Sequence, residues 1–336
     1  MTELKDVTVN EREDVRSLWG GIFFSAVVVV LIWALGERLE TIELLPDTGA
    51  AWYEWRLPVP TFWSRFTSWG LYIIHQVGFW YFIARAQKDK LRYSTSLNRW
   101  NKWALGWNSV FVLIHFLQTH LWYDGLAQDM AVWTSQGSVI VLLVWVLLME
   151  NKQRGLFWGK KVPIRKQVMQ WARKYHGYFF SWALIYTFWF HPMVSTSGHL
   201  IGFFYMFLLI LQGSLFFTRI HINRWWKLVQ ESLVMIHGAL VAVMQGNDLW
   251  GMFAFGFGGI FVLTQIHGLR LSKGWRWGIL ITYLAAVVLV YQFLFGLQNI
   301  HQITWIPFVE YLGVFILSVV IGVGLRVAGR WQPQEA

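Results

Sequence analysis

The sequence contains no cysteine among its 336 residues. This absence excludes disulfide bonds, thiolate zinc sites, iron–sulfur clusters, cysteine nucleophiles and covalently attached c-type haem. It does not indicate a compartment, because a chain without thiols is compatible with any redox environment. Any metal or cofactor must therefore be held by other side chains.

Charged residues are also scarce, at 14% of the chain against roughly 25% in an average soluble domain. Hydrophobic residues reach 56% and aromatic residues 18%. So few charges cannot cover the surface of a soluble protein of this size, whereas aromatic rings suit the boundary between lipid and water. The composition excludes a soluble enzyme, a disordered chain and a repeat solenoid, and it predicts a polytopic membrane protein.

Ten apolar runs have the length of about 20 residues that a helix needs to cross about 30 Å of hydrocarbon. They are continuous and lack the two-residue period of a membrane β-barrel. We therefore predict an all-α fold, a polytopic transmembrane helical bundle of about ten spans, forming a single integral membrane domain over residues 1–336. The runs lie at 17–37, 62–84, 103–123, 130–150, 175–193, 198–220, 227–246, 249–270, 276–298 and 306–327.

The basic residues predict the direction of the spans. Of the 28 Lys and Arg residues, all but Arg38, Arg56 and Arg65 lie on one predicted side of the membrane. That side comprises the two terminal segments, every second loop and the span ends next to those loops. Segments rich in Lys and Arg stay on the cytoplasmic side of a membrane. Both termini are therefore expected to be cytoplasmic, and the net charge of +10 needs no nucleic-acid partner. We expect a multi-pass protein of the cell inner membrane, in contact with membrane lipids.

Histidine is the main candidate for chemistry within the spans. All ten histidines fall within a span or at its edge. Intramembrane ionisable residues are costly and mark functional sites. Imidazoles without carboxylates suit haem, because the macrocycle supplies four of the iron ligands and the protein only the axial ones. Zinc or non-haem iron would usually demand three or more protein ligands, often with Asp or Glu. Haem b is therefore favoured, while another transition metal stays open.

Two histidines on one span predict a pair of haem sites. His176 and His191 are separated by about 22 Å of helix rise and about 60° of rotation. One helix can therefore present a histidine near each membrane face, which is the separation that two stacked haems need. On the inner side, depth pairs His176 with His267, and each precedes a glycine that lets a flat porphyrin approach.

The remaining histidines divide by depth. In a second haem site, the candidate partners of His191 are His199, His237 and His115. For central His75, His115 and His237, a hydrogen bond to a neighbouring helix is the structural alternative. Edge histidines are expected to anchor at lipid headgroups, namely His120, His199, His221 and His301. The candidate cofactor ligands are His75, His115, His176, His191, His237 and His267, and the candidate metal ligands are His176, His191 and His267.

The stretch from Arg173 through His176-Gly177 to His191 resembles the histidine-bearing helix of membrane b-type cytochromes. Cytochrome b561 and the ferric-reductase-like bundles also place two histidines on one helix, with a basic residue and a glycine beside the first. The resemblance covers about residues 170–270, a candidate haem-binding four-helix unit. It implies one or two bound haems b and electron transport, as an oxidoreductase or a subunit of one, with quinone and other redox subunits as partners.

Glu231 is the candidate catalytic residue, because it is the one carboxylate well inside a span. Its functional role would be proton uptake for a quinone or a transported ion. The structural alternative is a salt bridge at the inner boundary, to Arg219, Arg224 or Lys227. The other carboxylates close to spans lie near span ends, namely Glu150, Asp248 and Glu310.

Two other classes of function stay open. One is a transporter or channel for a metal ion, a proton or a small solute, although broken helices and inverted repeats are not evident. The other is a metal-dependent intramembrane enzyme that acts on a lipid or pigment. Against this second class, the sequence lacks the zincin HExxH motif, the histidine boxes of membrane desaturases and the paired Asp motifs of prenyltransferases.

Overall fold

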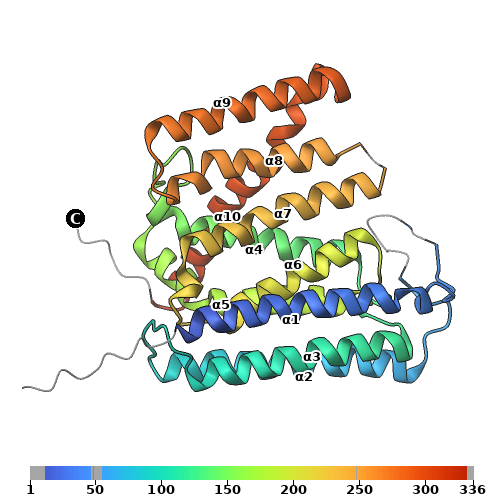
Figure 1. Cartoon of the computed structure of the whole chain (residues 1–336). Helices are drawn as coiled ribbons and strands as arrows, with labels where there is room; N and C mark the ends of the chain where they lie inside the picture. Colours follow the sequence, from blue (N-terminus) through green and yellow to red (C-terminus); the bar gives the residue numbers. More distant parts are fainter. Residues whose placement is uncertain (1–11, 47, 49–54, 247, 331–336) are drawn as a thin grey trace, which may run out of the picture.

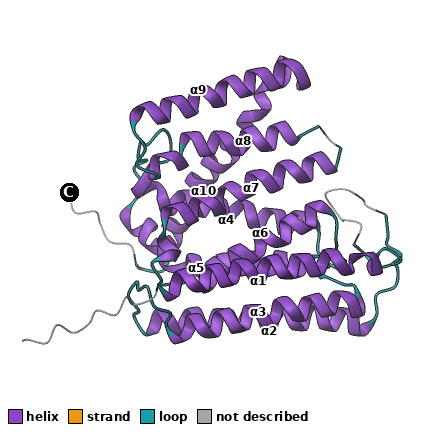
Figure 2. Ribbon diagram, viewed as in Figure 1, coloured by secondary structure: helices purple, strands orange, loops and turns teal. Residues whose placement is uncertain are grey.

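The computed structural model describes residues 12–46, 48, 55–246 and 248–330. Within these ranges the chain folds into ten α-helices joined by loops and short helical turns, and its β-structure is limited to isolated bridges (Figure 2). The helices are α1 Glu13–Leu35, α2 Phe62–Lys88, α3 Arg99–Trp122, α4 Val132–Arg154, α5 Lys166–Phe190, α6 Ser197–Ser214, α7 Arg224–Met244, α8 Trp250–Leu263, α9 Lys273–Val290 and α10 Trp305–Val327.

The prediction of an all-α fold is confirmed for the described residues, and each predicted apolar run overlaps one α-helix. Seven helical segments are long and apolar enough to cross a membrane, which is compatible with a multi-pass membrane protein. These segments are Glu13–Leu39, Val132–Arg154, Ser197–Ser214, Arg224–Met244, Trp250–Gly268, Lys273–Phe295 and Leu297–Val327.

Small polar side chains mark the start of several helices. Asn98 caps α3 by accepting hydrogen bonds from the backbone N–H groups of Trp100 and Asn101, and the Asn101 side chain accepts from the Asn98 N–H in return. Thr61 and Ser64 form the same reciprocal cap at the start of α2. Such caps satisfy backbone donors that a helix leaves free at its first turn.

The helices pack side by side (Figure 1) and enclose three apolar cores. The largest core is built from α1 to α6, a second from α4, α5, α8 and α10, and a smaller third from α1, α6, α7 and the turn before α7. Helix α5 contributes to the first through Ala183–Phe190 and to the second through Val168 and Ala172. Helix α9 lies at the edge against α8 and leaves most of its apolar side chains exposed, as a helix facing lipid would.

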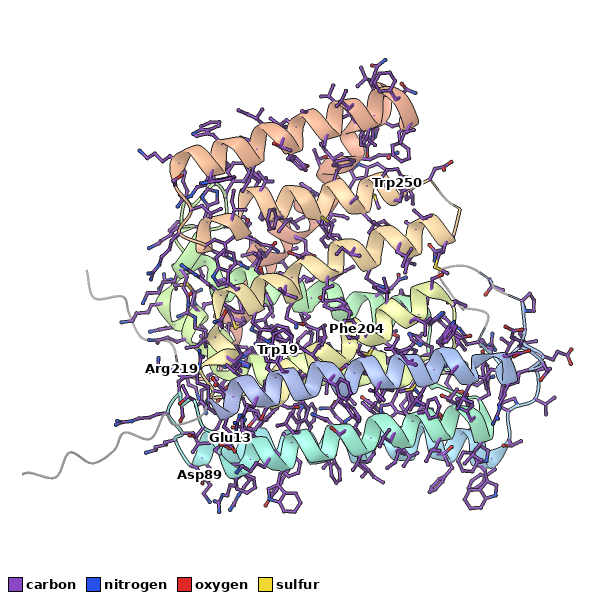
Figure 3. All side chains as sticks on the ribbon, in the orientation of Figure 1. Glu13, Trp19, Asp89, Phe204, Arg219 and Trp250 are labelled. Atoms are coloured by element: carbon purple, nitrogen blue, oxygen red, sulfur yellow. The ribbon has the colours of Figure 1, made fainter. Side chains whose placement is uncertain are left out.

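A buried carboxylate joins three segments at one end of the bundle. The Asp14 side chain is fully buried and accepts a hydrogen bond from the Ile220 N–H at 3.0 Å, while the Asp14 N–H donates to the Thr95 carbonyl. These bonds join the start of α1 to the α2–α3 and α6–α7 connections. Figure 3 shows Arg219 at this end and Trp250 at the opposite one, and the two ends are called here the Arg219 end and the Trp250 end.

Candidate functional site

His75 lies in the largest core with both ring nitrogens occupied. Its Nδ1 is 3.1 Å from Trp189 Nε1, and its Nε2 is 2.8 Å from Asn108 Oδ1. Tryptophan only donates, so Nδ1 is the acceptor and Nε2 carries the proton that it donates to Asn108. The ring also stacks on Phe111, with centroids 4.5 Å apart. In this arrangement His75 offers no nitrogen to a metal. It is a core histidine that hydrogen-bonds to neighbouring helices, which is the structural alternative given above.

His115 is likewise enclosed. Its Nε2 faces the His191 carbonyl oxygen at 3.1 Å, and its Nδ1 faces Gln118 Oε1 at 3.2 Å. The Gln118 amide nitrogen donates to the Asp124 carbonyl oxygen, which directs Oε1 toward the imidazole. A neutral imidazole has one N–H, so His115 donates to only one of these two oxygens. Both nitrogens nevertheless lie against protein atoms, and the contact with the His191 carbonyl links α3 to the residue that follows α5.

Three histidines meet at the Trp250 end, where α5 ends and α6 begins. The rings of His191 and His199 lie 5.1 Å apart at 81°, and Trp55 packs against both at 4.8 and 5.0 Å. His237 of α7 lies over Gly202, where an added Cβ would be 2.9 Å from its Cε1. Its Nδ1 is buried without a partner. We call His191, His199 and His237 the Trp250-end cluster.

The Trp250-end cluster does not match the second predicted haem site. Two imidazoles on opposite sides of one iron need about 6 Å between their ring centroids, whereas these centroids are 5.1 Å apart and the indole of Trp55 packs against both rings. Among the residues that the structure describes, no three His, Asp or Glu side chains are grouped to hold a metal ion. The structure thus brings His191 and His199 together, as one predicted pairing required, but in an arrangement unlike opposed axial ligands.

A different pair of imidazoles lies near the Arg219 end. His176 of α5 and His221, in the turn η3 Ile220–Ile222, have ring centroids 6.3 Å apart at 39°. His176 Nδ1 is 2.7 Å from the Arg173 carbonyl oxygen, and His221 Nδ1 is 2.8 Å from the Gln212 carbonyl oxygen. Carbonyl oxygens only accept, so both Nδ1 atoms carry the proton and donate. Each Nε2 then keeps a free lone pair.

The His176–His221 pair has the dimensions of two ligands on opposite sides of one ion. Metal–imidazole bonds are about 2 Å long, and a ring centroid lies about 1.1 Å behind its nitrogen, so two opposed imidazoles place their centroids about 6 Å apart. A carbonyl that accepts from Nδ1 is also the usual outer partner of a metal-binding histidine. The centroid separation of His176 and His221 is therefore the one that two histidine ligands of a single iron would need.

The structure does not bring His267, the predicted partner, into ring contact with His176. It lies in the turn η4 Gln265–Gly268, where its ring packs on Trp158 at 4.8 Å and both ring nitrogens are buried without a hydrogen-bond partner. The His176 ring instead contacts Phe180 and His221. Depth along the sequence could have identified His221, because it follows Arg219 as closely as His176 follows Arg173.

Two ion pairs lie between α4 and α7, in electrostatic range of the histidine pair. Arg154 Nη1 bonds to Glu231 Oε2 at 2.7 Å, and Lys227 Nζ bonds to Glu150 Oε2 at 3.0 Å. Glu150 interacts electrostatically with His176, and Lys227 with His221. Glu231 thus does form a salt bridge, but its partner is Arg154 instead of the three cations predicted. The four charges neutralise one another beside the pair.

A small cavity opens beside these ion pairs. Its volume is about 30 Å³, and Arg154, Arg224, Glu231 and Gln265 are among its lining residues. This is room for a water molecule or two. The Nε and Nη2 atoms of Arg154 are buried without a partner in the protein. A solvent molecule in this cavity would therefore find unsatisfied donors.

The Trp250 end holds a further set of ion pairs, between the first turn of α2 and the α3–α4 connection. Arg65 Nη1 bonds to Asp124 Oδ2 at 2.8 Å and to the Gly125 carbonyl oxygen at 3.0 Å, and Arg65 also pairs with Asp129. Burial raises the pKa of Asp124, and the hydrogen bond from Arg65 opposes that rise. One of the three cations that depart from the predicted charge asymmetry thus serves to close the α3–α4 connection.

Comparison with family models, curated proteins and solved structures gives no match to this chain. The function is therefore argued from side-chain geometry. The His176–His221 pair carries that argument furthest, because its ring centroids are 6.3 Å apart and both of its Nδ1 atoms donate to backbone carbonyls, which leaves both Nε2 lone pairs free.

Proposed function

We propose that this protein is a membrane-embedded b-type cytochrome that holds haem b between His176 and His221. The observation that carries the proposal is the 6.3 Å separation of two rings whose Nδ1 atoms both donate to backbone carbonyls. The electron-transfer partners in this proposal are a quinone and other redox subunits. When bound, haem supplies reversible one-electron chemistry.

The chain's own residues would set the conditions of that chemistry. The carbonyl groups of Arg173 and Gln212 fix the tautomer and orientation of the two imidazoles. The neighbouring Glu150–Lys227 ion pair holds one charge of each sign near the site. With haem bound, the carboxylate would favour the oxidised iron and the ammonium would favour the reduced iron, so loss of either charge would shift the potential.

The proposed topology has about ten spans, with both termini in the cytoplasm. Helices α2, α3 and α5 are not among the seven most apolar segments, yet they have 27, 24 and 25 residues. At 1.5 Å per residue each is about 36–40 Å long, enough to cross a bilayer. Helix α1 begins and α10 ends at the Arg219 end (Figure 1), which supports a common side for the two termini.

The test is the absorption spectrum of protein purified from haem-supplemented cells. We expect a low-spin bis-histidine spectrum that is lost in both His176→Ala and His221→Ala, because either ligand alone leaves the iron weakly held. His301→Ala is the matched control, since its ring is exposed. Monodisperse elution of each variant shows that loss of haem is not loss of fold.

Three outcomes would contradict the proposal. Colourless wild-type protein would show that no haem is bound. Transport assays in proteoliposomes and metal analysis would then distinguish the transporter hypothesis from the metal-dependent enzyme hypothesis. A full haem complement in both single variants would place the haem elsewhere. Loss of haem in only one variant would show that the two histidines are not a pair.

A further inference from the structure

Glu310 is a buried carboxyl group inside a candidate span. It lies five residues into α10, about 8 Å along the helix from Trp305. The residue is 3% exposed, and its Oε2 is buried without a hydrogen-bond partner. The segment Leu297–Val327 that contains it is among those apolar enough to cross a membrane. The sequence alone had placed this residue near a span end.

Close helix contacts seal both sides of Glu310. One turn earlier, Ile306 lies against Gly256 of α8, where an added Cβ would meet it at 3.0 Å. About one turn later, Gly313 lies against Val144 of α4, where an added Cβ would meet it at 2.6 Å. Both contacts leave no room for a further side chain, so Glu310 is enclosed between α4, α8 and α10.

The helices around Glu310 bring no free charge to it. Helix α8 has no titratable residue, and on α4 the charges of Glu150 and Arg154 are paired with α7 while Lys152 is exposed. Helix α5 enters the same core through apolar residues, and His301 in the preceding turn is exposed. Neighbouring tyrosines use their hydroxyl groups elsewhere: Tyr311 with Thr264 at 2.9 Å, and Tyr283 with the Phe255 carbonyl at 2.8 Å.

An ionised carboxylate in such a place would be unpaired and almost dry. The free-energy penalty for that state is large, and a buried acid avoids it by keeping its proton. We propose that Glu310 is a proton-binding site, a neutral carboxylic acid enclosed by α4, α8 and α10 that takes up and releases one proton. This inference is independent of haem and of the His176–His221 pair.

A hydrophobic carbodiimide is a direct chemical probe of this state. The protonated carboxyl adds across one C=N bond of the reagent: its oxygen bonds to the central carbon, and its proton moves to the nitrogen. The resulting O-acylisourea rearranges to a stable N-acylurea without loss of atoms. Ionised, paired carboxylates such as Glu231 lack the proton that the addition needs, so they serve as internal controls.

The experiment treats the full protein in lipid nanodiscs with dicyclohexylcarbodiimide and maps the adduct by peptide mass spectrometry. We expect modification at Glu310, a yield that falls as pH rises, no adduct at Glu231, and no adduct at position 310 in Glu310→Gln. Infrared spectroscopy should show a neutral carboxylic C=O band that this variant lacks. Absence of the adduct in wild type, equal labelling of Glu231, or an unchanged infrared band in Glu310→Gln would overturn the proposal.

Discussion

Arg154 donates a hydrogen bond from Nη1 to Glu231 Oε2 at 2.7 Å, and the two side chains are only 6% and 11% exposed. They join α4 to α7 beside the Lys227–Glu150 pair. Breaking a buried ion pair from one side leaves an uncompensated charge, which is more harmful than removing both partners. This asymmetry gives a way to separate a structural role of Glu231 from the proton-uptake role predicted from the sequence.

Glu231→Gln should lower the free energy of unfolding by about 3–5 kcal/mol, because Arg154 stays buried without its carboxylate. The double variant Glu231→Leu with Arg154→Leu should recover most of that loss. Thermal and chemical unfolding in detergent measure both effects. If Glu231→Gln instead has the stability of wild type but loses electron-transfer activity, proton uptake and not the ion pair is the main role of Glu231.

The helices could be predicted from the sequence because long apolar runs decide where a membrane helix forms. The site could be predicted only in part. His176 is a candidate ligand both in the sequence and in the proposed pair, but the predicted next span extends to residue 220, whereas α6 ends at Ser214. There the Asn101 side chain of α3 donates to the carbonyls of Ser214 and Phe216 at 2.8 and 2.9 Å. The chain then turns, which brings His221 back to α5.

The central histidines show a second limit of sequence reasoning. A buried imidazole looks the same in the sequence whether it binds a metal or a neighbouring side chain. Trp189 and Asn108, which engage His75, come from other helices than its own. Only the packing of α2, α3 and α5 brings these three residues together. Hydrogen-bond partners of this kind carry no short-range signal.

His75→Ala should destabilise the protein without changing any haem spectrum. The substitution leaves a cavity in the core and removes the partners of Trp189 Nε1 and Asn108 Oδ1. We expect a loss of about 3–5 kcal/mol from these two effects. Thermal unfolding of monodisperse protein measures it, with His301→Ala as an exposed control. Loss of the haem spectrum at full stability would instead make His75 a ligand.

Gly125→Ala should destabilise the protein by about 1–3 kcal/mol, as overpacking against rigid neighbours does. An added Cβ at this position would lie 2.6 Å from the Phe190 carbonyl oxygen, a backbone atom that cannot move aside alone. Gly106→Ala is the matched control, because nothing lies within 4 Å of its added Cβ. In a helix that change is neutral or stabilising, by up to about 1 kcal/mol. Equal melting temperatures for the two variants would refute the close approach of the α3–α4 connection to α5.

Asp89→Asn should produce a pH-dependent difference in stability from wild type. Asp89 Oδ2 accepts hydrogen bonds from Trp100 Nε1 at 2.7 Å and from Arg99 Nη2 at 3.0 Å, and these two interactions, in that order, hold its pKa below the usual 3.8. Because the pKa is lower in the folded state, the ionised carboxylate stabilises the α2–α3 connection above pH 3.8, and this contribution disappears as pH falls through the folded-state pKa. Melting temperatures of the two proteins should therefore differ at pH 7 and converge in acid.

The difference in melting temperature at pH 7 should be small and should shrink with added salt, because the Asp89–Arg99 ion pair is solvent-exposed. A gap that stays constant down to pH 2.5 would mean that the lost side-chain geometry, and not the charge of Asp89, is responsible.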